Sequence, residues 1–403
     1  MELPFLTYII YYISLFVGVF YLVIYFQSRN KLQSREYEEE PFVSVLVPAY
    51  NEEKNLLKIV DSFNEIDYPK EKLELIIIDD GSTDKTYELA TSFKDERIKV
   101  LRREKKSGKK AVPLNLGIKH AKGEIIVTLD ADTFMQPDLL KKSLSYFSDP
   151  SVAIVIPAAR PSNIKGFWRR MQLIEYTVAA FSRKILTFID SLSVAPTASV
   201  IKAEVFRDYG DYDENNLTED FEMGLRVVKN HHKVMHVIDS YVVTDVPDNF
   251  IGLFKQRLRW SYGTFYNLKK YKKLFSPKYG DMGVFYLPLI VVLTAFALFV
   301  FVKFFFDILI RGIRSFYLWA LSSFQISLRE IYPVSFITDP QILIGLFIAV
   351  LSFFIFVLAK KHTGEKRVNI INYFVYLLVY IFITIFFSLS AAVRFIIGWE
   401  PKW

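Results

Sequence analysis

Two aspartates, Asp130 and Asp132, stand one residue apart at the end of the apolar stretch GEIIVTLDADT. Their hard carboxylate oxygens can share a divalent cation and leave coordination positions open for a diphosphate. An isolated Asp-x-Asp pair is equally compatible with an ordinary turn. The apolar run before it favours a site, because acids that follow a buried strand lie at its carboxyl end, where such sheets bind ligands. The pattern therefore predicts a cation site at Asp130 and Asp132.

Two other polar clusters follow apolar runs in the same way. The stretch VSVLVPAYNEE ends in Pro48, Tyr50 and Glu52, and ELIIIDDGSTD carries Asp79 and Asp80. A turn and a helix cap account for the glycine and serine of the second stretch. They do not require two adjacent acids. The first stretch is either a loop that begins a helix or an aromatic and acidic wall for a nucleobase.

Three further motifs allow a functional and a structural interpretation. Lys109 and Lys110 form either a solvated basic loop or part of a phosphate-binding cleft. The triplet at 218–220 ends in Asp220, which either belongs to a helix cap or serves as general base for a hydroxyl acceptor. The stretch KQRLRW at 255–260 precedes an apolar run, so its basic residues either touch lipid headgroups or belong to an active site at the membrane surface.

The elements that must position these residues alternate between strands and helices. Apolar β-branched runs at 41–49, 73–79 and 124–129 are separated by segments of helical spacing. This alternation predicts an α/β domain with a doubly wound, Rossmann-like, mostly parallel sheet. Since ligands bind beyond the carboxyl ends of such strands, the polar clusters are expected to converge on one cleft.

Four nearly uncharged segments, at 4–26, 284–310, 341–359 and 370–393, are each long enough to cross a bilayer. We expect a retained N-terminal transmembrane helix (1–27), a soluble domain (28–280), and a C-terminal membrane region (281–403) of about three helices. Amphipathic stretches at about 166–189 and 250–275 are predicted to lie at the interface. Residues 315–339 are expected to form an outer loop or interfacial helix.

Basic residues cluster after the first apolar segment and between the last two, at 29–35 and 360–367. The positive-inside rule then predicts a cytoplasmic soluble domain, with both termini outside and a multi-pass protein in the plasma membrane. The net charge of +7 suits lipid headgroups or phosphorylated substrates, and no nucleic-acid partner is expected. The absence of cysteine excludes disulfides and thiolate metal sites.

Taken in order, six motifs resemble the family 2 glycosyltransferases with a GT-A fold. They cover residues 42 to about 262 and read VSVLVPAYNEE, IIIDDGSTD, GKKAVPLNLGI, GEIIVTLDADT, LTEDFEMGLRV and QRLRW. The last two resemble the membrane-embedded processive subgroup, which contains the cellulose, chitin, hyaluronan and poly-N-acetylglucosamine synthases.

The resemblance implies a role for each matching residue. The donor would be held by Pro48, Tyr50, Glu52, Asp79 or Asp80, Lys109, Lys110 and Asp130. Asp130 and Asp132 would bind Mg²⁺ or Mn²⁺, with Asp132 the principal ligand, and Asp220 would be the catalytic base. Gln256, Arg259 and Trp260 would close over the diphosphate and contact the acceptor sugar, whereas Arg257 stays a candidate headgroup anchor.

The expected activity is that of an inverting hexosyltransferase, because one carboxylate base with direct displacement inverts the anomeric carbon. It would use a UDP-sugar to extend a β-linked polysaccharide and move it across the membrane. The alternative is a non-processive enzyme with a lipid-linked or glycolipid acceptor. A channel with a nucleotide-sugar sensor would need neither Asp132 nor Asp220. Expected partners are the donor, an oligosaccharide or lipid-linked acceptor and membrane lipids, with no protein partner.

Overall fold

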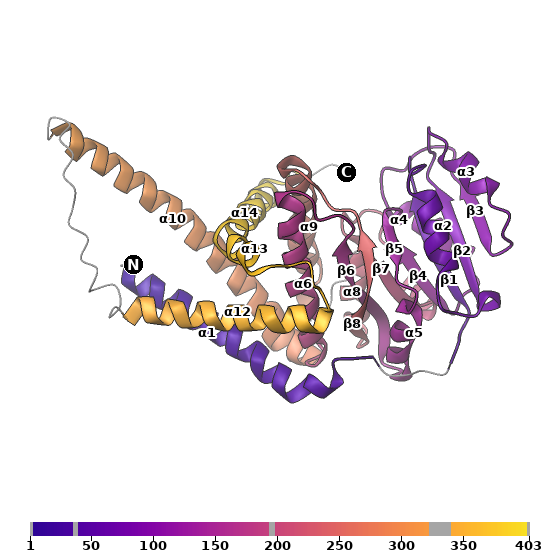
Figure 1. The fold of residues 1–403 in the computed structure, drawn as a ribbon, viewed down its shortest axis with the longest axis horizontal. Coiled ribbons are helices and arrows are strands. Elements are labelled where there is room, and N and C mark those ends of the chain that lie inside the picture. The colour runs from indigo at the N-terminus through magenta and orange to yellow at the C-terminus, as the bar shows by residue number, and fades with distance from the viewer. Residues whose placement is uncertain (1–2, 35–38, 193–197, 322–339, 401–403) are drawn as a thin grey trace.

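The computed structural model describes residues 3–34, 39–192, 198–321 and 340–400 (Figure 1). Within these residues one sheet of eight strands runs in the order β3-β2-β1-β4-β7-β6-β8-β5. Its strands are β1 (Val43–Ala49), β2 (Leu73–Asp79), β3 (Ile98–Arg102), β4 (Ile125–Leu129), β5 (Thr133–Met135), β6 (Val152–Pro161), β7 (Ala198–Lys202) and β8 (Lys233–Thr244).

The sheet is mixed, with its parallel part where the sequence predicted it. Strand β1 pairs in parallel with β2 and β4, β2 with β3, and β6 with β8. Strand β7 is antiparallel to both β4 and β6, and β5 is antiparallel to β8. The predicted α/β class is confirmed, and the antiparallel β7 adds a reversal that the alternating pattern did not indicate.

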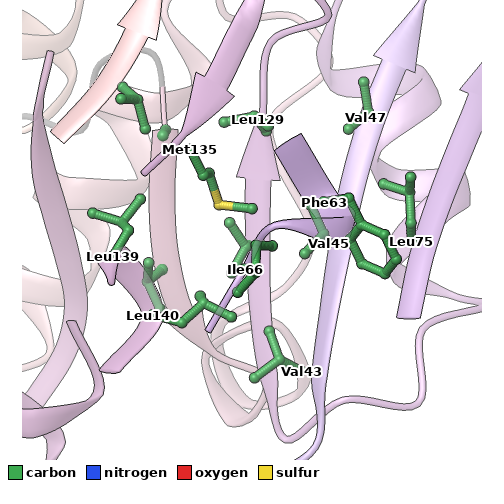
Figure 2. Packing of buried hydrophobic residues seen from close by; sticks show 14 of the residues in the cluster. Val43, Val45, Val47, Phe63, Ile66, Leu75, Leu129, Met135, Leu139 and Leu140 are labelled. Carbon is green, nitrogen blue, oxygen red and sulfur yellow. The ribbon is translucent and has the colours of Figure 1, made fainter. Parts of the chain in front are cut away.

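Helices cover both faces of the sheet, which explains why its strands read as nearly continuous apolar runs. Val43, Val45 and Val47 point to one face, where α2 (Leu56–Asn64) and α5 (Leu139–Leu144) pack through Phe63 and their leucines (Figure 2). Leu46 points to the other face, which is covered by α4 (Ala111–Ile118) and α8 (Glu219–Lys229). Short helices α3 (Thr86–Ser92) and α7 (Glu204–Tyr209) complete the layers.

Two longer helices lie between the sheet domain and the apolar helices. These are α6 (Phe167–Thr187) and α9 (Phe250–Lys270), at the positions where the sequence predicted amphipathic helices. Both pack on their apolar neighbours through aromatic side chains, as between Phe254 and Phe387.

Among the described residues, four helical stretches are long and apolar enough to cross a membrane: Thr7–Lys31, Met282–Leu321, Ile342–Thr363 and Ile370–Ile397. They contain most of α1 (Leu3–Ser28), α10 (Leu287–Leu321), most of α12 (Pro340–Thr363), and α13 (Ile370–Val375) joined to α14 (Ile381–Ile397) by a π-helical segment. Figure 1 shows α1, α10 and α12 extending away from the sheet domain.

Helix α10 continues past the predicted end at residue 310. Arg311 and Arg314, which end the nearly uncharged run of the sequence, lie within this helix. Inside the predicted span, Lys303 and Asp307 stand one turn apart and form an ion pair of 2.8 Å. Of the predicted outer loop or interfacial helix at 315–339, residues 315–321 are helical and continue α10, so the loop is wrong there, and residues 322–339 lie outside the described residues.

Candidate active site

A cavity of about 1080 Å³ lies at the carboxyl ends of β1 and β4 and is closed by the start of α8 and the middle of α9. The predicted residues that line it are Pro48, Tyr50, Glu52, Asp80, Lys109, Lys110, Asp130, Asp132, Asp220, Gln256, Arg259 and Trp260. The sheet thus brings together clusters that lie up to half the chain apart, as strand-end geometry predicts.

Asp79 is the predicted residue that does not line this cavity. Its side chain is fully buried at the end of β2, where it accepts a hydrogen bond of 3.1 Å from the Ser82 amide and faces Arg102 at 3.4 Å. Asp80 lines the cavity and accepts hydrogen bonds from the amide and hydroxyl of Ser107, at 2.9 and 2.6 Å. Of the two alternatives, the geometry favours Asp80 as the residue that meets a ligand.

The loops after β1 and β2 are fastened to each other. Asn51, with a φ of 57°, donates its amide to the Ser82 hydroxyl at 3.0 Å and accepts the Thr83 amide at 2.9 Å. Beside this clamp the Lys106 ammonium lies 3.8 Å from the centre of the Tyr50 ring. The arrangement holds one flat aromatic face at the cavity wall, as a nucleobase pocket requires.

Lys110 connects the acids of β4 with those of α8. Its ammonium forms ion pairs with Asp130 and, at 3.8 Å, with Glu219. Burial alone would lower the pKa of Lys110, but the carboxylates of Asp130, Glu219 and Asp220 outweigh it and raise that pKa. Lys110 therefore stays charged and holds the two acidic groups in one site.

Asp132 lies in an excess of negative charge. Burial, followed by the charge of Asp130, raises the pKa of the Asp132 carboxyl to about 7, and Glu52 and Asp245 act in the same direction. Its oxygen accepts a hydrogen bond of 3.1 Å from Thr133. A cation would relieve this repulsion, so the residues fit a divalent metal.

The protein itself would supply only a few of the ligands to such a metal. Within the described ranges no group of three or more histidines, cysteines and acids could hold a metal ion. Asp130 and Asp132 would supply two carboxylates, and donor phosphate and water would supply the remaining ligands.

Asp245 is a cavity residue that the sequence reasoning missed. It follows the carboxyl end of β8, and its amide donates to the Asp132 carbonyl at 3.3 Å. The signal was present, because an acid after an apolar run marks the ends of β2 and β4 as well. The run VIDSYVVTD contains polar residues that conceal the true end of β8.

The triplet at 218–220 begins α8, but Thr218 makes no side-chain cap for that helix. Its hydroxyl instead accepts a hydrogen bond of 2.9 Å from the Asn267 amide of α9. Burial, followed by the charge of Asp220, raises the pKa of Glu219 to about 7. Burial also raises the pKa of Asp220, against the opposing effect of Lys110.

Helix α9 is fixed closely against this triplet. Asn267 exchanges hydrogen bonds of 2.7 and 3.2 Å with Asn216, and both side chains are buried. A Cβ at Gly263 would lie only 2.3 Å from the Thr218 hydroxyl oxygen, so the close approach depends on glycine. The Arg259 guanidinium reaches the Leu217 carbonyl at 3.4 Å.

Arg257 is not a headgroup anchor, and that interpretation is wrong. Only 6% of Arg257 is exposed, and its guanidinium forms an ion pair of 2.7 Å with Glu175 of α6. It also lies 4.1 Å from the centre of the Trp260 ring, while Tyr380 donates to the same Glu175 carboxylate at 2.8 Å. Arg257 thus joins α6, α9 and the last apolar helix and supports Trp260.

Comparison with known proteins agrees with this site. Residues 44–210 match the model of the glycosyl transferase family 2. These residues form a family 2 glycosyltransferase domain. The matched range contains β1, β2 and β4, together with the predicted nucleotide and metal residues, and it ends before α8 and α9.

Relatives of the family 2 domain include two kinds of synthase. A beta-monoglucosyldiacylglycerol synthase from a Nostoc species is 27% identical over 290 residues, which are 69% of this chain and 62% of that protein. A poly-beta-1,6-N-acetyl-D-glucosamine synthase from Staphylococcus epidermidis is 28% identical over 240 residues, which are 59% of this chain and 58% of that protein. The chain therefore spans about three fifths of the length of each relative.

The arrangement of the family 2 domain and its helices also has a counterpart among solved structures. A mannosyltransferase from Pyrobaculum calidifontis, solved with GDP-Man and Mn²⁺, superposes with a TM-score of 0.59 at 19% identity, and 97% of this chain and 99% of that one are covered. At this identity the likeness shows the fold.

Proposed function

We propose that this protein is a membrane-bound inverting glycosyltransferase that moves a hexose from a nucleotide-sugar to the hydroxyl of an acceptor held at the membrane surface. One observation carries the proposal. A single cavity holds the strand-end acids Asp130 and Asp132 together with Asp220 at the start of α8. A diphosphate leaving group needs a cation, and an attacking hydroxyl needs a base. The same cavity offers carboxylates for both roles.

The donor side of the cavity is formed by the loops after β1 and β2. Tyr50 offers an aromatic face to the base, and Glu52 and Asp80 offer carboxylates to the ribose hydroxyls. Bound at Asp132 and Asp130, Mg²⁺ or Mn²⁺ would stabilise the charge that develops on the diphosphate. Support for a nucleotide-sugar comes from the mannosyltransferase of similar fold, whose structure contains GDP-Man and Mn²⁺. The sequence motifs favour a UDP-sugar.

Asp220 supplies the base. Its carboxylate takes the proton of the acceptor hydroxyl while that oxygen bonds to the anomeric carbon and the bond to the diphosphate breaks. The raised pKa of Asp220 makes it a stronger base than an exposed aspartate. Because one displacement occurs without a protein nucleophile, the configuration inverts and an α-linked donor gives a β-linked product.

A lipid-linked or glycolipid acceptor is the candidate that the geometry favours. A second cavity of about 270 Å³ lies between α9 and the start of α10, next to the helix that carries Trp260. Six of its ten lining residues are apolar and the other four carry hydroxyls: Ser261, Thr264, Phe265, Leu268, Ile290, Val291, Thr294, Ala295, Leu298 and Ser388. Such a lining suits a hydrocarbon chain beside the site where its head group would react.

A growing β-linked polysaccharide, translocated as it is made, is the second candidate. The order of the motifs through QRLRW supports it, as does the relative named as a poly-beta-1,6-N-acetyl-D-glucosamine synthase. For either acceptor we propose that residues 28–280 lie in the cytoplasm at the plasma membrane. The basic residues at 29–35 and 360–367 of the sequence support this orientation.

Product analysis tests the proposal. Purified protein is incubated with radiolabelled UDP-sugars, or GDP-mannose for comparison, together with Mn²⁺ and a lipid extract. A chloroform-soluble product with one sugar supports the lipid acceptor, and a long water-soluble polymer supports the polysaccharide. Donor binding without turnover across the panel would overturn the proposal in favour of a sensor.

A further inference from the structure

The last apolar helix, residues 370–397, has the length and composition of a membrane span. Its contacts with the rest of the protein indicate a different position. We infer that α14 lies in the plane of the membrane beneath α9 and returns the chain to the catalytic cavity, where Glu400 becomes part of the acceptor side.

Helix α14 runs beside α9 for most of the length of α9. At the beginning of α9 the rings of Phe250 and Phe254 lie 5.4 and 5.3 Å from Phe387. Farther along, the hydroxyl oxygens of Ser261 and Ser388 are 3.4 Å apart.

The pairing continues near the end of α9. The ring of Phe395 lies 5.6 Å from Tyr262 and 6.0 Å from Phe265. Lys269, in the last turn of α9, reaches over the same ring at 5.8 Å. The two helices therefore run in the same direction, side by side.

Helix α9 cannot pass through hydrocarbon. Lys255 and Arg259 lie in its first half and Lys269 and Lys270 in its last turn, so both halves carry charge. Such a helix belongs at the membrane surface. Because α14 is fixed beside it at both ends, α14 cannot run along the membrane normal. In Figure 1, α14 accordingly lies across the long direction followed by α1 and α12.

The two faces of α14 agree with an in-plane position. Phe387 and Ala391 are fully buried, and Ala391 packs with Leu258 of α9. On the outer face Ile396 and Ile397 are 81% and 63% exposed. Both faces are apolar, so one side of α14 packs against protein while the other can face the acyl chains.

The chain then turns back at the end of α14. Gly398 has a φ of 72°, and the Trp399 amide donates to the Arg394 carbonyl at 2.9 Å while its ring lies 4.6 Å from the Arg394 guanidinium. The following residue, Glu400, lines the large cavity together with Trp260. The proposed donor residues come from the β1 and β2 loops instead. If the proposed function holds, Glu400 accepts hydrogen bonds from the acceptor's hydroxyls.

This arrangement changes the topology predicted from the sequence. With α14 in the plane, the crossing helices among the described residues are α1, α10 and α12. Residue 400 then lies on the same side of the membrane as the sheet domain, whereas four crossings would place it on the opposite side.

The absence of cysteine from the sequence makes this directly measurable. Single variants Glu400→Cys, Glu96→Cys and Ser315→Cys are expressed and treated with a membrane-impermeant maleimide, in intact cells and after lysis. Glu96 is exposed on the sheet domain and Ser315 is exposed in the outer part of α10. We expect E400C to label with the sidedness of E96C. Labelling with the sidedness of S315C overturns the inference.

A cross-link tests the helix pairing independently of activity. The double variant Ser261→Cys with Ser388→Cys should form a disulfide in native membranes under mild oxidation, because the hydroxyl oxygens are 3.4 Å apart. The matched control moves the second cysteine to Ser390, whose hydroxyl bonds within α14 to the Phe386 carbonyl. Equal cross-linking of both pairs, or none of either, contradicts the pairing.

The role of Glu400 is read from kinetics. Glu400→Gln should raise the KM for the acceptor in the lipid extract at least fivefold and leave the KM for the donor unchanged, and Glu400→Asp should recover part of the loss. Unchanged kinetics overturn the acceptor role of Glu400. The position of α14 is tested separately, by the labelling experiment. If E400C labels as expected but the wild-type protein transfers no sugar, the proposed function alone is contradicted.

Discussion

Asp220 is the residue on which the proposed chemistry most depends. Replacing it with asparagine removes the proton acceptor and keeps the size of the side chain. We expect Asp220→Asn to lower kcat by about 10²–10⁴-fold, the usual contribution of a general base. Donor affinity, measured by calorimetry, should change less than threefold. Asp208→Asn is the matched control, because Asp208 is exposed on α7. Substantial transfer by D220N would assign the base elsewhere.

The pH dependence of transfer should report the same carboxyl. Burial raises the pKa of Asp220 above the ordinary aspartate value of 3.8. Only the ionised form accepts a proton, so kcat should be constant above the raised pKa and fall about tenfold per pH unit below it. The profile is measured at saturating Mn²⁺, and Asp220→Glu should displace its acid limb. An acid limb at or below 3.8, or one unmoved in D220E, contradicts the assignment.

Metal affinity is the corresponding test for Asp132. Asp132→Asn removes one carboxylate charge from a site where that charge attracts the cation. We expect the Mn²⁺ concentration for half-maximal transfer to rise at least tenfold, and chelation with EDTA to abolish transfer by the wild type. Titration of Mn²⁺ followed by electron paramagnetic resonance gives a readout without turnover. Unchanged Mn²⁺ affinity in D132N would mean that another group holds the ion.

Single residues were predictable where a strand end supplied the context. Asp130, Asp132 and Asp220 follow or begin regular elements, so their place in the cavity could be expected from the sequence. Asp79 and Asp80 could not be separated, because the choice depends on which carboxylate the Ser82 amide binds. Glu400 lay beyond prediction, since its position depends on the packing of α14 against α9.

At the scale of elements, the contact between α8 and α9 aligns the base with Arg259 and Trp260. Gly263→Ala places a methyl group 2.3 Å from the Thr218 hydroxyl oxygen. We expect it to lower the free energy of unfolding by about 1–3 kcal/mol, the usual cost of overpacking, and to lower kcat as α9 moves. Gly312→Ala, whose Cβ meets nothing within 4 Å, is the control. Wild-type thermal unfolding and kcat in G263A would show that the contact is not required.

The elements themselves were predicted unevenly. The strands β1, β2 and β4 were clear because helices bury both of their faces and make them uniformly apolar. Strand β7 was missed because antiparallel pairing inside an α/β sheet leaves no mark in the alternation of strands and helices. The end of α10 was placed too early, because the nearly uncharged run stops at Arg311 while the backbone stays helical through Leu321.

For the whole molecule, Glu175 joins the sheet domain to the membrane region through Arg257 and Tyr380. Glu175→Gln leaves the Arg257 charge buried without its partner. We expect a loss of about 2–3 kcal/mol in the free energy of unfolding, below the value for a fully buried pair because the Glu175 side chain is 25% exposed. Tyr380→Phe loses one hydrogen bond and should cost about 1 kcal/mol. Thermal unfolding in detergent measures both, and equal stability in E175Q and wild type would contradict this role.

The balance of charge in the large cavity has a consequence for how the donor arrives. Acids outnumber basic residues in its lining, even though Lys110 holds two of those acids together. A bare nucleotide diphosphate is itself anionic and would meet a repulsive field at the entrance. The cavity therefore discriminates by net charge before it does so by shape, and it admits most readily a donor whose charge has already been reduced in solution.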